Sequence, residues 1–177
     1  MLRIVKKILL VGGVLLGLLV LAFFALGFIF PKLENKTRIE IDKPRELVWN
    51  YFVDEGKMSE WMPNLKQIEL VGGRRHEVGS RYRMTFEENG RRVVMEETLT
   101  EFRPNELFAF HLENEIISDD VRVNFTEENG KTVIVQEDSI VGGNAFWRSL
   151  FVLARSGMQS SARKYYENLK RNVERLD

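Results

Sequence analysis

Cysteine is absent from the 177 residues of this chain, and histidine occurs only twice. The absence of cysteine excludes disulfides, thiol nucleophiles and thiolate metal sites. His76 and His111 lie too far apart in the sequence to suggest a metal site by their spacing. Basic and acidic side chains balance at 26 each, so no net field draws the chain to nucleic acid or to acidic lipid. We therefore predict no metal, no cofactor and no nucleic-acid partner.

Charge is missing altogether from one long segment, residues 8–30, which reads ILLVGGVLLGLLVLAFFALGFIF. At 1.5 Å per residue a helix of this length spans about 34 Å, enough to cross a hydrocarbon core of about 30 Å. The basic residues Arg3, Lys6 and Lys7 precede it. The pattern predicts a transmembrane helix over 8–30, with a short basic tail at 1–7 and a linker at 31–36.

A cleaved signal peptide is the alternative, because Ala25-Leu26-Gly27 is a small-x-small triplet. The apolar run is longer than the usual hydrophobic region of about 7 to 15 residues, which favours an uncleaved anchor. Gly13 and Gly17 match the GxxxG packing pattern, so a homodimer through them is a weaker hypothesis. Basic residues flank both ends, but the short basic tail resembles a signal anchor. We expect the following domain, residues 37–177, to be extracytoplasmic.

The remaining residues, 37–177, are enough for one domain with a hydrophobic core. Apolar residues alternate with polar ones in several short runs, a pattern typical of strands. Pro44 marks the start of a helix that carries Leu47, Val48 and Phe52. Asn-Gly pairs at 89–90 and 129–130 indicate hairpins. The sequence predicts about seven antiparallel strands, over residues 37–41, 68–70, 82–86, 91–102, 107–112, 121–125 and 132–140.

The last element is a long helix that begins after Asn144, a plausible cap, and runs about 45 Å. Its apolar residues recur every three or four positions, so one face is expected to lie across the sheet. The middle of this face carries small residues, namely Ala154, Gly157, Ser160, Ser161 and Ala162. These small residues either leave a cavity between helix and sheet or allow close contact between them, and composition alone does not decide.

Several local patterns resemble the START-like superfamily of polyketide cyclase/dehydrase and lipid-transport proteins, also called SRPBCC or Bet v 1-like. The patterns are Val48-Trp49, Trp61-Met62-Pro63, Val78-Gly79, Thr100-Glu101-Phe102-Arg103-Pro104 before Glu106-Leu107, and Phe125 followed by Asn129-Gly130-Lys131-Thr132. The resemblance covers about residues 37–173. It implies an α+β helix-grip fold, in which a bent antiparallel sheet surrounds the long C-terminal helix. It also implies an internal cavity for apolar ligands, and so favours the cavity over close contact.

Glu97 is the most informative ionisable residue, because it shares a strand face with Val93, Met95 and Leu99. If that face is the inner one, a carboxyl group points into an apolar cavity, where burial raises its pKa. The alternative is that Glu97 lies at the sheet edge and is solvated. We expect the phenol of Tyr82 to be its partner. His76 is expected in a solvated loop, and His111 on the outer face of its strand.

The function that these expectations favour is a non-enzymatic, membrane-anchored domain that binds an apolar small molecule or lipid. The predicted ligand-binding residues are Tyr82, Met84, Phe86, Met95, Glu97, Leu99, Phe151, Met158 and Tyr165. Two alternatives remain open: a cyclase- or dehydratase-like enzyme with Glu97 as acid/base, and a ligand-free module that binds another protein.

Overall fold

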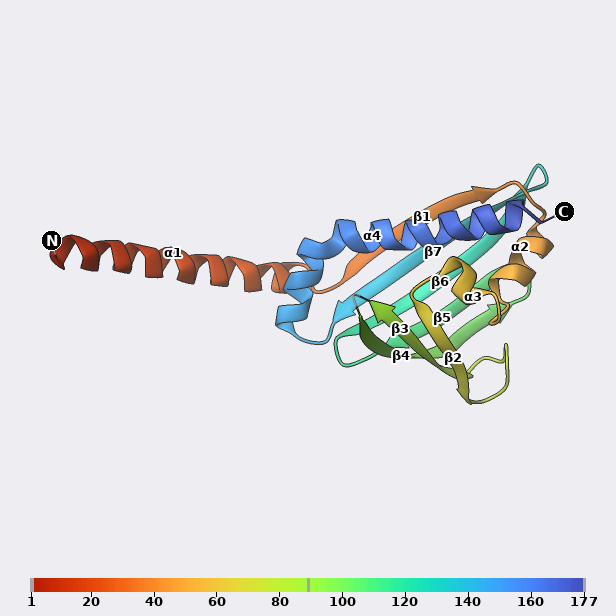
Figure 1. The fold of residues 1–177 in the computed structure, drawn as a ribbon, viewed down its shortest axis with the longest axis horizontal. Coiled ribbons are helices and arrows are strands. Elements are labelled where there is room, and N and C mark those ends of the chain that lie inside the picture. Colours follow the sequence, from red (N-terminus) through yellow and green to blue (C-terminus); the bar gives the residue numbers. More distant parts are fainter. Residues whose placement is uncertain (1, 89, 177) are drawn as a thin grey trace.

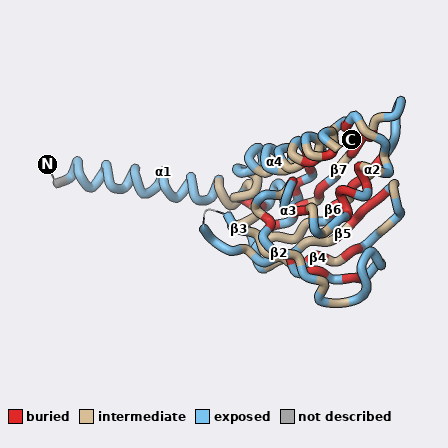
Figure 2. The backbone as a smooth tube through the Cα atoms, turned by 45° about the vertical axis from the view of Figure 1, so that its right-hand side comes forward, coloured by how far each residue is buried: buried red, intermediate tan, exposed pale blue. Residues whose placement is uncertain are grey.

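The computed structural model describes residues 2–88 and 90–176. Its first element, α1 (Leu2–Ile29), projects away from the rest of the molecule (Figure 1). The segment Arg3–Ile29 is long and apolar enough to cross a membrane, a property that signal sequences share. Figure 2 shows that α1 is exposed along most of its length.

Two boundaries differ from those expected. The basic residues of the tail continue α1, which begins at Leu2, and the first strand begins at Leu33 rather than after residue 36. Residues 34–36 extend that strand because they pair with the last strand of the sheet, Glu34 opposite Ser139 and Lys36 opposite Glu137. The linker is therefore only residues 30–32.

A seven-stranded antiparallel sheet forms the body of the domain, which confirms the predicted fold class. The strand order is β1-β7-β6-β5-β4-β3-β2, so β2 to β7 form a meander and β1 pairs with β7. Asn129 and Gly130 both have positive φ, as a two-residue hairpin turn requires. Asn89, in the other expected turn, lies outside the described residues. The strands are β1 (Leu33–Ile41), β2 (Leu65–Gly72), β3 (Arg81–Glu88), β4 (Arg91–Arg103), β5 (Leu107–Glu113), β6 (Ile117–Glu128) and β7 (Lys131–Gly142).

An aromatic cluster closes one end of the sheet, under the short helices α2 (Arg45–Phe52) and α3 (Met58–Trp61). Phe52 lies at its centre, with ring centroids 5.1 Å from Phe125, 5.3 Å from Trp61 and 5.7 Å from Phe108. Such aromatic pairs stabilise beyond the area they bury, by about 1 kcal/mol each. The cluster therefore forms a rigid closed end of the domain.

The long helix α4 (Ala145–Glu174) lies along the sheet (Figure 1). The side chain of Asn144 caps it, accepting a hydrogen bond of 3.1 Å from the backbone N–H of Trp147. Its C-terminal half is anchored by the buried residues Tyr166, Leu169 and Val173. Residues 153–157, in its middle, are exposed, so this stretch of the helix is not packed into the core.

The start of α4 is held by the end of α1 instead. The backbone N–H of Gly27 donates a hydrogen bond of 3.1 Å to Ser149 Oγ, and Ser149 is fully buried. A Cβ at position 27 would lie 2.8 Å from the carbonyl oxygen of Ala145, so only glycine allows this approach. The ring centroids of Phe23 and Phe146 lie 5.6 Å apart beside this contact. The last turns of α1 are thus packed against the start of α4.

Candidate functional site

A cavity of about 260 Å³ lies between the inner face of the sheet and α4. Its floor is mostly apolar and comes from six strands, β1 and β3 to β7. The apolar residues of this floor are Met84, Phe86, Phe108, Phe110, Leu112, Val121, Val123 and Ile140. Its roof and closed end come from the helices and from Met62, which follows α3. They contribute Phe52, Met58, Trp61, Met62, Met158, Ser161, Ala162, Tyr165 and Tyr166.

Three carboxyl groups interrupt this apolar lining, from Glu97, Asp119 and Asp138. The strand register explains two of their positions. Glu97 lies opposite Leu112, and Leu112 lies opposite Asp119, so one row across the sheet carries two acids. Adjacent strands are about 4.8 Å apart, so the Cα atoms of Glu97 and Asp119 are about 10 Å apart. Two acids therefore face the same space from different strands.

Glu97 is 5% exposed, and it accepts no hydrogen bond from the residues that the structure describes. Burial raises its pKa to about 7, and the charge of Glu55 adds to this effect. Tyr82 lies opposite Glu97 on β3, but its hydroxyl makes no hydrogen bond to Glu97 and accepts one of 3.4 Å from the backbone N–H of His76. Glu97 is therefore an unpartnered carboxyl facing an apolar space.

The second polar group lies where β6 and β7 run side by side. Burial raises the pKa of Asp119 to about 7, helped by the charge of Asp138, although the N–H of Ser139 donates to Asp119 at 3.1 Å. Burial also raises the pKa of Asp138. The hydroxyl of Tyr166 donates to the amide oxygen of Gln136, whose amide nitrogen donates to Asp138. This chain of hydrogen bonds fixes the orientation of Asp138.

Five of the nine predicted ligand-binding residues line the cavity: Met84, Phe86, Glu97, Met158 and Tyr165. The other four lie outside its lining. Tyr82 and Leu99 are buried beyond it, and Met95 is half-buried towards the β3–β4 hairpin. Phe151 lies near the start of α4, with its ring centroid 6.0 Å from that of Trp147.

The stretch of small residues on α4 contributes only at its C-terminal end, through Ser161 and Ala162. Gly157 is exposed, and a Cβ placed on it meets nothing within 4 Å. The expectation that Gly157 faces the sheet is therefore wrong.

The two histidines lie away from the cavity. His111 Nδ1 lies 2.7 Å from Asp120 Oδ1 on the outer face of β5 and β6, as expected. This contact is the main reason that the pKa of His111 is raised. His76 is exposed, and its ring stacks on Phe102. Within residues 2–88 and 90–176, no group of three or more acidic or histidine side chains is placed to hold a metal ion.

Among the polar residues of the cavity that were not predicted from the sequence, three lie on β6 and β7: Asp119, Gln136 and Asp138. The alternation of side chains between the two faces of a strand could have identified them. Asp119 is two residues before Val121 and so points to the same face, and Gln136 and Asp138 share the face of Ile134 and Ile140. The strand expected from the sequence begins at residue 121, whereas β6 begins at Ile117 and includes Asp119.

The sheet, the long C-terminal helix and the cavity between them define a helix-grip, Bet v 1-like protein. The family model for polyketide cyclase/dehydrase and lipid transport matches residues 33–174. The chain belongs to this family, as the motifs in its sequence suggested. Among curated proteins, none matches the chain.

Solved structures share the fold at low sequence identity. The crystal structure of Ara h 8.0201 superposes with a TM-score of 0.67 and 12% identity, covering 80% of this chain and 97% of that one. TTHA0849 from Thermus thermophilus gives 0.63 and 18%, with coverage of 80% and 97%. The di-domain ARO/CYC protein BexL, from the BE-7585A biosynthetic pathway, gives 0.66 and 18%, covering 83% of this chain and 52% of BexL.

The buried carboxyl of Glu97 makes stability depend on pH. Its pKa is about 7 in the folded chain and about 4.5 in the unfolded chain, so the unfolded state loses its proton first as the pH rises. Folding stability should fall between pH 4.5 and 7, by about 3 kcal/mol, and then level off. Thermal unfolding of the full chain in micelles should show this slope, reduced in Glu97→Gln.

The matched control for this prediction is Glu96→Gln, which removes the neighbouring carboxyl from the opposite, exposed face of β4. The raised pKa of Asp119 also makes folding stability fall as the pH rises. Glu97→Gln should therefore remove only part of the pH dependence of stability. Equal slopes in wild type and Glu97→Gln would contradict the burial of an ionisable Glu97.

Proposed function

We propose that this chain is a membrane-anchored domain that binds an apolar small molecule or lipid in the cavity under α4. The observation that carries the proposal is the cavity itself, apolar on most of its wall and provided with an unpartnered carboxyl at Glu97. An enclosed apolar space with a few polar groups is the usual form of a small-molecule site. The family to which the chain belongs supports the same function.

The composition of the cavity wall suits a flexible apolar ligand. Four of the six methionines of the chain line the cavity, namely Met58, Met62, Met84 and Met158. Methionine is unbranched and polarisable, so its side chain adapts to ligands of different shape. The carboxyl groups gather at β4, β6 and β7, so a ligand with one polar end has a defined orientation.

The membrane anchor in this proposal is α1. Its contact with α4 supports an uncleaved helix, because cleavage after Gly27 would separate the glycine from the buried Ser149. The linker of residues 30–32 then holds the domain against the bilayer, on the extracytoplasmic side. Gly13 and Gly17 have open space around them, which leaves room for the helix of a second copy.

A cyclase- or dehydratase-like reaction is the second candidate function. The supporting observation is the pKa of about 7 at Glu97, since an acid/base works best when its pKa lies near the working pH. A module that binds another protein without a ligand needs no cavity, and it has less support.

Glu97→Gln separates binding from catalysis, because it keeps the size of the side chain and removes the proton transfer. An enzyme should lose turnover by at least about a hundredfold with its ligand still bound, the contribution typical of general acid/base groups. A binding domain should keep its ligand with altered affinity. Product analysis and ligand retention, measured on the same two proteins, distinguish the two.

Filling the cavity tests the binding function. Ala162→Leu adds a bulky group to the cavity wall, whereas Gly157→Leu adds the same group on the exposed side of the same helix. Native mass spectrometry of full-length protein extracted from its membrane should show a bound species in wild type and Gly157→Leu. We expect at least a tenfold lower occupancy in Ala162→Leu. A ligand-free wild type, or equal occupancy in all three proteins, would contradict the proposal.

A further inference from the structure

The charged side chains that line the cavity all have the same sign. The lining includes Glu97, Asp119 and Asp138, and no lysine, arginine or histidine from residues 2–88 and 90–176. Arg155 of α4 lies at the sheet edge, where it donates to Oδ1 of the lining residue Asn35 at 3.3 Å and to the carbonyl of Glu34 at 2.8 Å. The cavity therefore offers carboxyl groups without a matching cation.

The carboxyl of Glu97 strengthens this observation because it has no partner. It is 5% exposed and accepts no hydrogen bond from the described residues. An acid in such a place is either protonated or compensated by a positive charge that is bound next to it. Asp119 faces the same space two strands away, so a bound positive group reaches one carboxyl or both.

We propose that the ligand is a cationic amphiphile, with an apolar body in the methionine- and phenylalanine-lined space and an ammonium group among Glu97, Asp119 and Asp138. This inference rests on the proposed function and names the ligand class for the same cavity. An ammonium donates up to three hydrogen bonds to acceptors and offsets the burial of the carboxylates. Fatty acids and other anionic amphiphiles are disfavoured by the same three groups.

Three probes of equal chain length test the charge preference: decylamine, decanol and decanoate. On the full chain in micelles, native mass spectrometry should show decylamine at least tenfold tighter than decanol, and decanoate weakest. The double variant Glu97→Gln/Asp119→Asn should lose this preference. Asp120→Asn is the matched control, because it removes an acid beside Asp119 that faces His111 on the outer surface.

The outcomes separate this inference from the proposed function. Binding of decanol equal to that of decylamine overturns the cationic ligand and keeps the cavity function. Absence of binding by all three probes overturns both. A preference for decylamine that survives the double variant also overturns the inference, because the charge then acts from outside the cavity.

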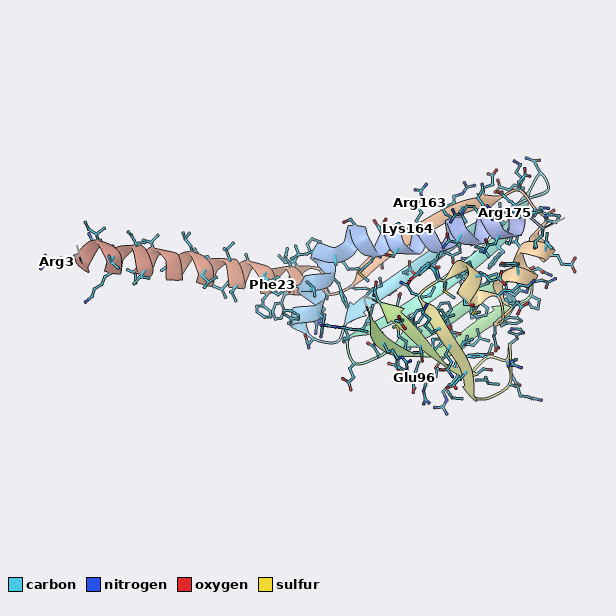
Figure 3. All side chains as sticks on the ribbon, in the orientation of Figure 1. Arg3, Phe23, Glu96, Arg163, Lys164 and Arg175 are labelled. Atoms are coloured by element: carbon cyan, nitrogen blue, oxygen red, sulfur yellow. The ribbon has the colours of Figure 1, made fainter. Side chains whose placement is uncertain are left out.

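A second observation, independent of the cavity, concerns the depth of α4 in the membrane. Phe146 and Ser149, in its first turns, contact Phe23 and Gly27 of α1 (Figure 3, where Phe23 is labelled). Phe23 and Gly27 lie seven and three residues before the end of the apolar run at Phe30, or about 10 and 5 Å along the helix. If α1 crosses the bilayer, residues that touch these positions lie at the same depth.

The surface around this contact is apolar, as such a depth requires. Phe146 is 47% exposed and Leu153 is 61% exposed, and both Ile116, just before β6, and Val141, near the end of β7, are also exposed. Between Ala145 and Ala154 the only charged residue is Arg148. Its Nε is buried and has no hydrogen-bond partner among the described residues.

The geometry points to an α4 whose first turns, residues 146–153, are embedded in the outer part of the bilayer beside the end of α1. The occupant of this apolar surface is lipid, because the surface continues that of the membrane helix. Trp147 then lies near the interface, where tryptophan is enriched. This inference rests on α1 spanning the membrane.

Tryptophan fluorescence in vesicles of acyl-brominated phosphatidylcholine measures this contact directly. Trp49 and Trp61 are buried in the domain core, so Trp147 is the tryptophan within reach of lipid. Brominated lipid should quench about a third of the emission of the full chain, since one tryptophan of three is affected. Trp147→Phe should abolish this quenching, and Phe146→Trp in the same background should restore it.

A control within α1 distinguishes the two claims. Leu15→Trp in the Trp147→Phe background reports on the span itself. Quenching at position 15 with none at 146 or 147 overturns the embedding of α4 and leaves the anchor intact. No quenching at any of these positions overturns the anchor. Contact with a second copy instead of lipid gives no quenching at 146 or 147, and so overturns the inference as well.

Discussion

The cavity exists because α4 is packed at its two ends, whereas in its middle hydrogen bonds from Arg155 and Gln159 hold it to the edge strand β1 rather than to the core. At the C-terminal end, Tyr166, Leu169 and Val173 are buried against the sheet and the aromatic cluster. At the N-terminal end, Ser149 is fixed by the backbone of Gly27. Residues 153–157 between them are exposed, and small side chains follow at Ser161 and Ala162. A helix held at both ends collapses onto the sheet less easily than one held at a single point.

The hydrogen bond between Gly27 and Ser149 also links the cavity domain to the apolar helix. A hinge of flexible residues would let the domain turn freely, whereas a three-residue linker and a packed helix contact hold one orientation. The apolar start of α4 then continues the surface of α1. The proposed binding in the cavity and the proposed attachment to the membrane thus both involve α4.

Much of the fold was predictable because local patterns and tertiary structure agree in this chain. The alternation of Tyr82, Met84 and Phe86 and the Asn129-Gly130 turn each specify their element without help from distant residues. The site was predicted only in part. Asp119 was missed because pairing with β5 and β7 extends its strand beyond the apolar run, and pairing is a property of the sheet. Whether Gly157 faces the sheet or the solvent depends on how α4 lies on the sheet. That placement is set by contacts at the two ends of the helix, which are distant from Gly157.

Resonances of the cavity methionines test the central claim most directly. Full-length protein with ¹³C-labelled methionine methyl groups is titrated with decanol, an uncharged probe, in micelles. Ligand binding in the cavity predicts shifts at Met58, Met62, Met84 and Met158 that saturate together, and their loss in Ala162→Leu. Unchanged methyl resonances in the wild type, or equal shifts in both proteins, would contradict the account of a ligand-binding cavity under α4.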